Sequence, residues 1–259
     1  MTTLATLQNM KIRGEKIAVL TCYDASFAVL CEAAGIDVLL VGDSLGMVLQ
    51  GCSDTLGVTM QDMEYHTRCV ARGAKSALIL VDMPYRSDAT LQLALDNAQR
   101  LMAAGAHMVK LEGRKTEVVQ QLVSHNIPVC GHLGFTPQSI RELGGYKVQG
   151  RDAAGAQQIL DDALALQQAG ACLMLLEMVP AALAKRVTRE LSIPTIGIGA
   201  GPDCDAQVLV LHDILGIYPG KTPKFVRNFL DGTASVQDAL ASYVKAVKDG
   251  SFPAAAHSF

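Results

Sequence analysis

Short apolar runs alternate with longer amphipathic stretches along the whole chain. Eight such runs, each bounded by Gly, Pro or an acidic residue, cover residues 17–24, 37–44, 76–84, 107–113, 128–134, 172–180, 194–201 and 208–216. Their apolar residues are continuous rather than alternating, as expected for parallel strands that are buried on both faces. The stretches between them, such as 60–74, 90–106 and 153–171, have helical spacing. Eight strands alternating with helices predict an α/β protein of the (β/α)8, or TIM barrel, type.

The predicted barrel accounts for most of the chain. Its 259 residues match the roughly 250 residues of a typical barrel of this type. No low-complexity linker divides them, so we expect a single catalytic domain over residues 1–259. The eighth strand is the least distinct, because the segment before it has room only for a short turn of helix. We expect extra N-terminal and C-terminal helices, the latter in the tail from about Thr222, where they would cap the barrel or pack against a neighbouring subunit.

One unit recurs four times: a glycine at the end of a predicted helix, a buried strand, and a carboxylate at the carboxyl end of that strand. The glycines are Gly35, Gly73, Gly105 and Gly170, and the carboxylates are Asp43, Asp82, Glu112 and Glu177. In a barrel, all these strand ends lie on one face, where active sites are built. An acid in this position can also cap the following helix. Because two of the four are Glu, which caps poorly, the pattern favours a functional cluster.

Three of these acids follow successive predicted strands and could share a cation. Neighbouring strands lie about 4.8 Å apart, so Asp43, Asp82 and Glu112 can converge on one ion. Without a cation, their mutual repulsion would force protonation. An all-oxygen ligand set suits Mg²⁺, or Mn²⁺ as a substitute, and does not suit zinc. Magnesium keeps positions for a bidentate ligand such as a 2-oxo acid, and Glu177, two strands further round, would face that ligand as a general base.

Further candidates lie beside these acids. Lys110 and Glu112 point to the same side of their strand, into the barrel. The lysine could bind a substrate carboxylate or a developing enolate oxygen, or it could only balance the charge of Glu112. A Schiff-base role is disfavoured, because the surrounding acids would raise its pKa. His132, at the end of the fifth strand, is a candidate hydrogen-bonding residue or a structural one. Ser44, in the GDSLG segment, could donate a hydrogen bond to ligand oxygens.

The glycine loop GIGAG (197–201) is similar to the phosphate-binding loops of such barrels. The same glycines would also serve a tight turn, so both interpretations stay open.

Composition narrows the class of partner. The formal net charge is -3 and no basic block occurs, so nucleic acid and anionic membranes are poor candidates and a small molecule is favoured. The 7 cysteines form no C-x-x-C pair, which leaves zinc-ribbon and iron–sulfur sites without support. They are typical of reduced thiols in a cytoplasmic protein. Because residues 1–16 lack the apolar stretch of a signal peptide and the longest apolar runs are of strand length, we expect neither a signal peptide nor a membrane span.

Several segments of the chain resemble ketopantoate hydroxymethyltransferases. They are VGDSLGMVLQG (41–51), YHTRCVARGA (65–74), VKLEG (109–113), VCGHLGFTPQS (129–139), GGYKVQGR (144–151), IGIGAG (196–201) and HDILGI (212–217). The matches run in order from Thr21 to Phe229 and extend to the final HSF. The resemblance implies a (β/α)8 barrel that transfers a hydroxymethyl group from 5,10-methylenetetrahydrofolate to 3-methyl-2-oxobutanoate. The product, 2-dehydropantoate, belongs to pantothenate biosynthesis.

The same resemblance implies roles for individual residues. Asp43, Asp82 and Glu112 fall on the magnesium positions, with one ion per subunit. Asp43, Ser44, Asp82 and Lys110 fall on contacts with the 2-oxo acid, beside which we group His132, and Glu177 falls on the proton acceptor. The implied reaction passes through an enolate stabilised by the metal and Lys110. Family members are commonly homodecamers, and no residue set in the sequence specifies the folate site.

Two other interpretations compete with this one. A magnesium-dependent 2-oxo acid lyase or mutase of the isocitrate lyase–phosphoenolpyruvate mutase type would carry a K-[KR]-C-G-H loop. Here Cys130-Gly131-His132 matches only in part, since Pro128 and Val129 precede it. A non-catalytic ligand-binding or assembly protein is the other alternative. The complete set of acids argues against it, because a cluster of buried charges is costly to keep.

Overall fold

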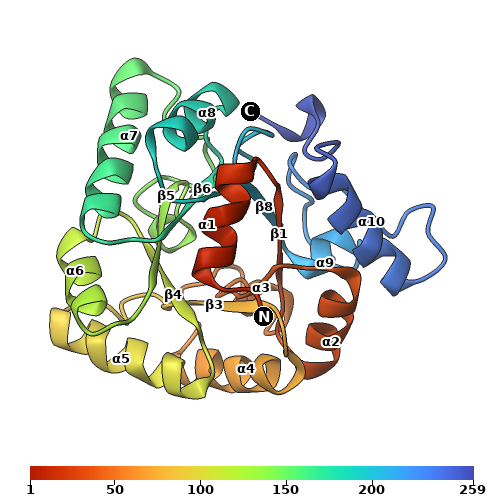
Figure 1. The fold of residues 1–259 in the computed structure, drawn as a ribbon, viewed down its shortest axis with the longest axis horizontal. Helices are drawn as coiled ribbons and strands as arrows, with labels where there is room; N and C mark the ends of the chain where they lie inside the picture. Colours follow the sequence, from red (N-terminus) through yellow and green to blue (C-terminus); the bar gives the residue numbers. More distant parts are fainter.

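The computed structural model describes residues 1–259, and its parallel strands close into a barrel in sequence order (Figure 1). The strands are β1 (Ile17–Thr21), β2 (Val38–Val41), β3 (Leu78–Asp82), β4 (Met108–Glu112), β5 (Val129–Gly134), β6 (Leu173–Glu177), β7 (Thr195–Ile198) and β8 (Ala206–Leu209). β8 pairs with β1 through Val19 and Val208, which completes the ring. The predicted TIM barrel is confirmed.

Helices surround this ring (Figure 1). They are α1 (Leu4–Arg13), α2 (Ala25–Ala34), α3 (Leu45–Val48), α4 (Met60–Gly73), α5 (Leu91–Ala104), α6 (Thr116–Ser124), α7 (Ala153–Gln168), α8 (Ala181–Glu190), α9 (Leu211–Ile214) and α10 (Val236–Lys248), with 3₁₀ turns at Pro137–Ser139 and Ala255–His257. The helices predicted at both ends of the chain are present as α1 and α10, and α10 packs against α2. No helix combines the length and the apolar character needed to cross a membrane.

The alternation of strand side chains divides the core in two. Inward-facing residues such as Val19, Val38 and Leu80 fill the barrel, while outward-facing residues pack under the helices. Leu7 and Met10 of α1 belong to the inner cluster, and α1 lies across the centre of the ring in Figure 1. Since α1 covers the amino ends of the strands, only the carboxyl end of the barrel stays open to a ligand.

At that open end, the last inward positions of several strands are polar. Asp82 ends β3, Lys110 and Glu112 come from β4, His132 from β5, and Glu177 ends β6. The register sets Asp82 beside Lys110 and Glu112 beside His132 on neighbouring strands. One correction concerns β5, which continues to Gly134, so His132 lies inside the strand and not at its end. Strand pairing alone therefore gathers these charges.

The glycine pattern is confirmed at three positions and wrong at one. Gly35, Gly105 and Gly170 have φ of 91°, 115° and 105°, the left-handed conformation that commonly ends a helix. Gly73 instead lies within the last turn of α4. A Cβ there would lie 2.2 Å from the carbonyl oxygen of Ala25, so this glycine permits close packing of α4 against the start of α2.

The eighth strand differs from its prediction at both ends. β8 covers Ala206–Leu209, and the second half of the apolar run forms the short helix α9. The segment between β7 and β8 is a loop without a turn of helix. Leu211 and Ile214 of α9 are as buried as strand residues, and an apolar run cannot by itself separate a strand from a buried helix.

Candidate active site

A cavity of ≈ 750 Å³ opens at the carboxyl end of the barrel. All the candidate residues from the sequence line it: Asp43, Ser44, Asp82, Lys110, Glu112, His132 and Glu177. Sequence-distant strand ends therefore meet around one space, as the recurring strand–acid unit predicts.

Lys110 lies at the centre of the charged cluster. Its Nζ is 3.0 Å from Asp82 Oδ1 and 3.1 Å from His132 Nδ1. Burial alone would lower the pKa of Lys110, but the charges of Asp82, Glu112 and Asp43 outweigh burial and raise it. The side chain is thus an ammonium, which agrees with the expectation that it does not form a Schiff base.

The three predicted metal-binding acids carry more negative charge than one lysine balances. Asp43 donates its backbone N–H to Asp82 Oδ2 at 3.0 Å. Burial, and then the charges of Asp82 and Glu112, raise the pKa of Asp43 well above its usual value. Burial also acts to raise the pKa of Glu112, but contacts with His132 and Lys110 outweigh it and lower that pKa. Asp43 is the acid that most needs a further positive charge in order to ionise.

Gln138, which sequence reasoning missed, ties two of these acids together. Its Nε2 donates to Asp43 Oδ2 at 2.8 Å and to the carbonyl oxygen of Met83 at 3.0 Å. Its backbone N–H donates to Glu112 Oε2 at 2.9 Å. The residue sits in the 3₁₀ turn after β5 that begins at Pro137. The proline in this polar segment was the one available signal of a fixed turn.

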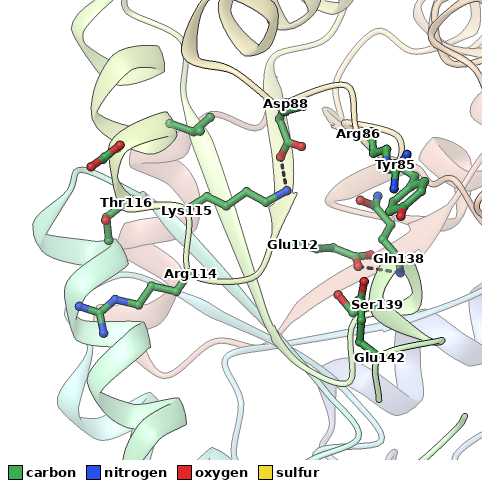
Figure 2. A pocket seen from close by; sticks show the side chains of 13 residues that line it. Tyr85, Arg86, Asp88, Glu112, Arg114, Lys115, Thr116, Gln138, Ser139 and Glu142 are labelled. Atoms are coloured by element: carbon green, nitrogen blue, oxygen red, sulfur yellow. Dashed lines mark hydrogen bonds and ion pairs between the residues drawn. The ribbon is translucent and has the colours of Figure 1, made fainter. Parts of the chain in front are cut away.

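A second, more polar hollow of ≈ 560 Å³ lies behind Gln138 and also borders Glu112. Figure 2 shows Gln138 directed toward Glu112 on one side of this hollow and Lys115 paired with Asp88 on the other. Arg114 points away from both and pairs with Asp162 on α7 at 3.1 Å. Lys115, Asp88 and Arg114 are thus paired within the chain, whereas Arg86, Glu117 and Glu142 line the hollow without an ion-pair partner.

Tyr23 is another residue that the sequence did not single out. Its hydroxyl lies 2.9 Å from Ser44 Oγ, and its side chain is buried. Ser44 itself is half-buried and lines the cavity. The hydrogen bond between the two hydroxyls therefore fixes the position of the Ser44 side chain at the edge of the cavity.

Glu177 faces the cluster across the cavity, with the ring of His132 beside it. The His132 ring lies between the two sides of the cavity: Nδ1 is 3.1 Å from Lys110 Nζ and 3.5 Å from Glu112 Oε1, and the other ring nitrogen is Nε2. That nitrogen is 3.3 Å from Glu177 Oε2. Gly134 lets the end of β5 lie close to the end of β6, because a Cβ at this position would lie 2.2 Å from the carbonyl oxygen of Glu177. Met178, next to Glu177, has a left-handed φ of 47°, and such local strain is common at functional sites.

The three acids have the ligand chemistry that a hard divalent cation requires, but their side chains are not spaced as metal ligands in this structure. Asp43, Asp82 and Glu112 offer only oxygen ligands, as Mg²⁺ prefers. Glu112 Oε1 is buried and accepts no hydrogen bond, so it is available to a cation. No three His, Cys, Asp or Glu side chains already stand at metal-ligand spacing. The carboxylates would therefore have to close on an ion that binds between them.

The glycine loop at 197–201 is packed under two aromatic rings. Gly199 has φ of 59°, and a Cβ there would lie 2.8 Å from the ring of Phe225 and 3.1 Å from that of Phe259. Both rings line the cavity. Gly199 thus serves aromatic packing in this structure rather than contact with a phosphate.

Comparison with known proteins identifies the family of the chain. Residues 1–255 match the family model described as ketopantoate hydroxymethyltransferase. A 3-methyl-2-oxobutanoate hydroxymethyltransferase of Methylobacillus flagellatus is 61% identical over 259 residues, covering 99% of each chain. The one of Azoarcus sp. is 59% identical and covers 99% of this chain and 96% of its own. Among solved structures, phosphonopyruvate hydrolase is similar in fold, with a TM-score of 0.63, 14% identity and 81% of both chains covered.

Proposed function

The chain belongs to the ketopantoate hydroxymethyltransferase family of enzymes, and from that premise we propose that it transfers a hydroxymethyl group from 5,10-methylenetetrahydrofolate to 3-methyl-2-oxobutanoate. The product is 2-dehydropantoate, a precursor of pantothenate. The observation that carries the proposal is Glu177 opposite the buried cluster of Lys110, Asp82 and Glu112 in one cavity. A small 2-oxo acid between them would have a base on one side and positive charge on the other.

We assign a resident Mg²⁺, one per subunit, to Asp43, Asp82 and Glu112. When bound, the ion would act as a Lewis acid that polarises the oxygens of the 2-oxo acid. The oxygen-only donor set and the buried, unpartnered Glu112 Oε1 support this assignment. The structure of the phosphonopyruvate hydrolase was determined in complex with oxalate and Mg²⁺, so a barrel of this fold can hold such a pair.

The side chains of the chain supply the proton transfer and the charge stabilisation. The Lys110 ammonium and the Ser44 hydroxyl donate hydrogen bonds to substrate oxygens, which orients the acid. Glu177 removes the proton from C3, and His132, whose Nε2 is 3.3 Å from Glu177 Oε2, lies beside that carboxylate. Lys110 stabilises the negative charge that moves to the ketone oxygen. Water hydrolyses the methylene bridge of the folate, so that both C–N bonds break and tetrahydrofolate leaves with one proton on each nitrogen. C3 then adds to the carbon of the formaldehyde so formed, whose oxygen takes up the proton that left C3 and becomes the hydroxyl group.

Hydrogen exchange at C3 in deuterated water tests the base directly. The wild-type protein with magnesium should exchange the C3 hydrogen of 3-methyl-2-oxobutanoate, and Glu177→Gln should lower that rate by at least about 100-fold. Glu190→Gln, which removes an exposed carboxylate on α8, is the matched control and should exchange normally. Wild-type exchange in Glu177→Gln would show that another group is the base.

The main alternative function is that of a lyase or mutase of the isocitrate lyase–phosphoenolpyruvate mutase type, which would need no folate.

We further propose one catalytic domain over residues 1–259, assembled with other copies of the chain. The resemblance suggests a homodecamer, which sedimentation would check. A cytoplasmic location is our proposal as well, supported by seven free cysteines, since thiols stay reduced in that compartment.

A further inference from the structure

The residues assigned above occupy only part of the cavity wall. They rise from β2, β3, β4, β5 and β6, whereas the arc from β7 through β8 to β1 carries none of them. A small branched 2-oxo acid would fill a minor part of ≈ 750 Å³. The inward-facing side chains of β7 and β8 in this arc, Ile198 and Val208, are apolar. This arc has the space and the surface for a second, larger and flatter molecule.

One acidic side chain stands in this apolar arc: Asp213 of α9. Contacts with the barrel fix the position of α9. Leu211 donates its N–H to Thr21 Oγ1 on β1 at 2.8 Å, and the side chains of Leu211 and Ile214 are buried. Burial raises the pKa of the Asp213 carboxyl to about 6. Lys221 and Lys224 also line the cavity, but neither is paired with Asp213, and Lys224 Nζ donates to the carbonyl oxygen of Ser258. An uncompensated carboxylate in a cavity is costly for the fold, and such groups are typical of binding sites.

Aromatic rings face the same part of the cavity. Tyr218, Phe225 and Phe259 belong to the segments that follow α9 and line the cavity with Asp213. Phe259 is fixed in place, because its carbonyl oxygen accepts the N–H of Ala181 at 2.8 Å and Lys224 Nζ lies 5.0 Å from its ring centre. Flat apolar walls beside one carboxylate suit a planar heterocycle that carries N–H donors on one edge.

We infer that Asp213 binds the pterin ring of the folate co-substrate, its two carboxylate oxygens accepting from the ring N3–H and the 2-amino group. This inference rests on the function proposed above. The pyrimidine edge of a pterin presents two parallel N–H donors, and a carboxylate accepts such a pair in a bidentate geometry. The pairing also supplies the hydrogen bonds that this half-buried carboxylate lacks within the chain. Asp213 would thus be the residue that selects a 2-amino pterin.

The test is equilibrium binding of two probes, tetrahydrofolate and its 2-desamino analogue, to the full chain with magnesium and 3-methyl-2-oxobutanoate present. Wild type should bind tetrahydrofolate roughly 30- to 100-fold more tightly than the analogue, as expected for hydrogen bonds to a charged group. Asp213→Asn should bind tetrahydrofolate weakly and discriminate less than about threefold. Asp231→Asn removes an exposed carboxylate from the same tail and is the matched control. Near-ultraviolet circular dichroism checks that each variant is folded.

Each outcome bears on the inference. Retained discrimination in a folded Asp213→Asn would overturn it, even if turnover falls, because the carboxylate would then act on the chemistry and not on the pterin edge. Wild type that forms product but discriminates poorly would also overturn it while leaving the proposed function intact. Wild type that neither binds tetrahydrofolate nor uses methylenetetrahydrofolate would remove both.

Discussion

Replacing Lys110 by Met tests how much the charge of this lysine, among the acids at the carboxyl end of the barrel, contributes to the free energy of unfolding. Lys110 Nζ and Asp82 Oδ1 are 3.0 Å apart, with 5% of each side chain exposed. At an effective dielectric constant of about 20, two unit charges at that distance attract by roughly 5 kcal/mol. Removing one partner of a buried pair costs about 3–5 kcal/mol, because the other charge is left unpaired. For a chain of this size, that loss should lower the melting temperature by about 10 °C.

The assay is thermal and urea unfolding of Lys110→Met with and without magnesium. The matched control is Lys245→Met, which removes a lysine 2.6 Å from Asp249 on the surface, where the side chains are 79% and 40% exposed; it should cause no measurable loss. Magnesium should stabilise Lys110→Met more than wild type, because a cation that binds only the folded state adds to its stability and the variant has more negative charge to neutralise. A loss in Lys110→Met no larger than in the control, or equal magnesium effects in both proteins, would refute this reasoning.

Two further predictions concern residues that the structure added to the site. Gln138→Leu removes the donor to Asp43 Oδ2 and should weaken magnesium binding about 10- to 100-fold, as measured by calorimetry, since partners that orient metal ligands have effects of this size; unchanged affinity would contradict the proposed role of the amide. Asp213→Asn should change how the free energy of unfolding depends on pH. The pKa of Asp213 is raised to about 6 in the folded state, so the wild-type protein becomes less stable as the pH rises from about 4 through 6 and this carboxyl ionises. In urea titrations, the variant should therefore match wild type near pH 4 and exceed it by about 2 kcal/mol at pH 7.5, whereas parallel pH profiles would show that the carboxyl is not desolvated.

The fold and most of the cluster could be predicted because both follow from strand periodicity. Continuous apolar runs marked the strands, and the alternation of side chains placed Lys110 and Glu112 on one face of β4. The carboxyl ends of parallel strands must meet at one face of a barrel, so Asp82 and Glu177 could be assigned to that face without coordinates.

The residues that were missed depend on loops, whose direction the local sequence does not determine. Gln138 reaches Asp43 because a turn beginning at Pro137 folds back over the mouth. Tyr23 meets Ser44 only because β1 and β2 are neighbours in the ring. Asp213 was hidden in the apolar run that we interpreted as a strand over 208–216. Asp213 lines the cavity because the second half of this run forms the helix α9 after β8 ends at Leu209.

Product formation from 3-methyl-2-oxobutanoate, with methylenetetrahydrofolate and magnesium each present or absent, tests the central claim most directly. The account predicts 2-dehydropantoate only when both are present, loss of product on chelation, and its return when magnesium is added back. Turnover of the 2-oxo acid without folate, or full activity in protein shown to be free of metal, would contradict it.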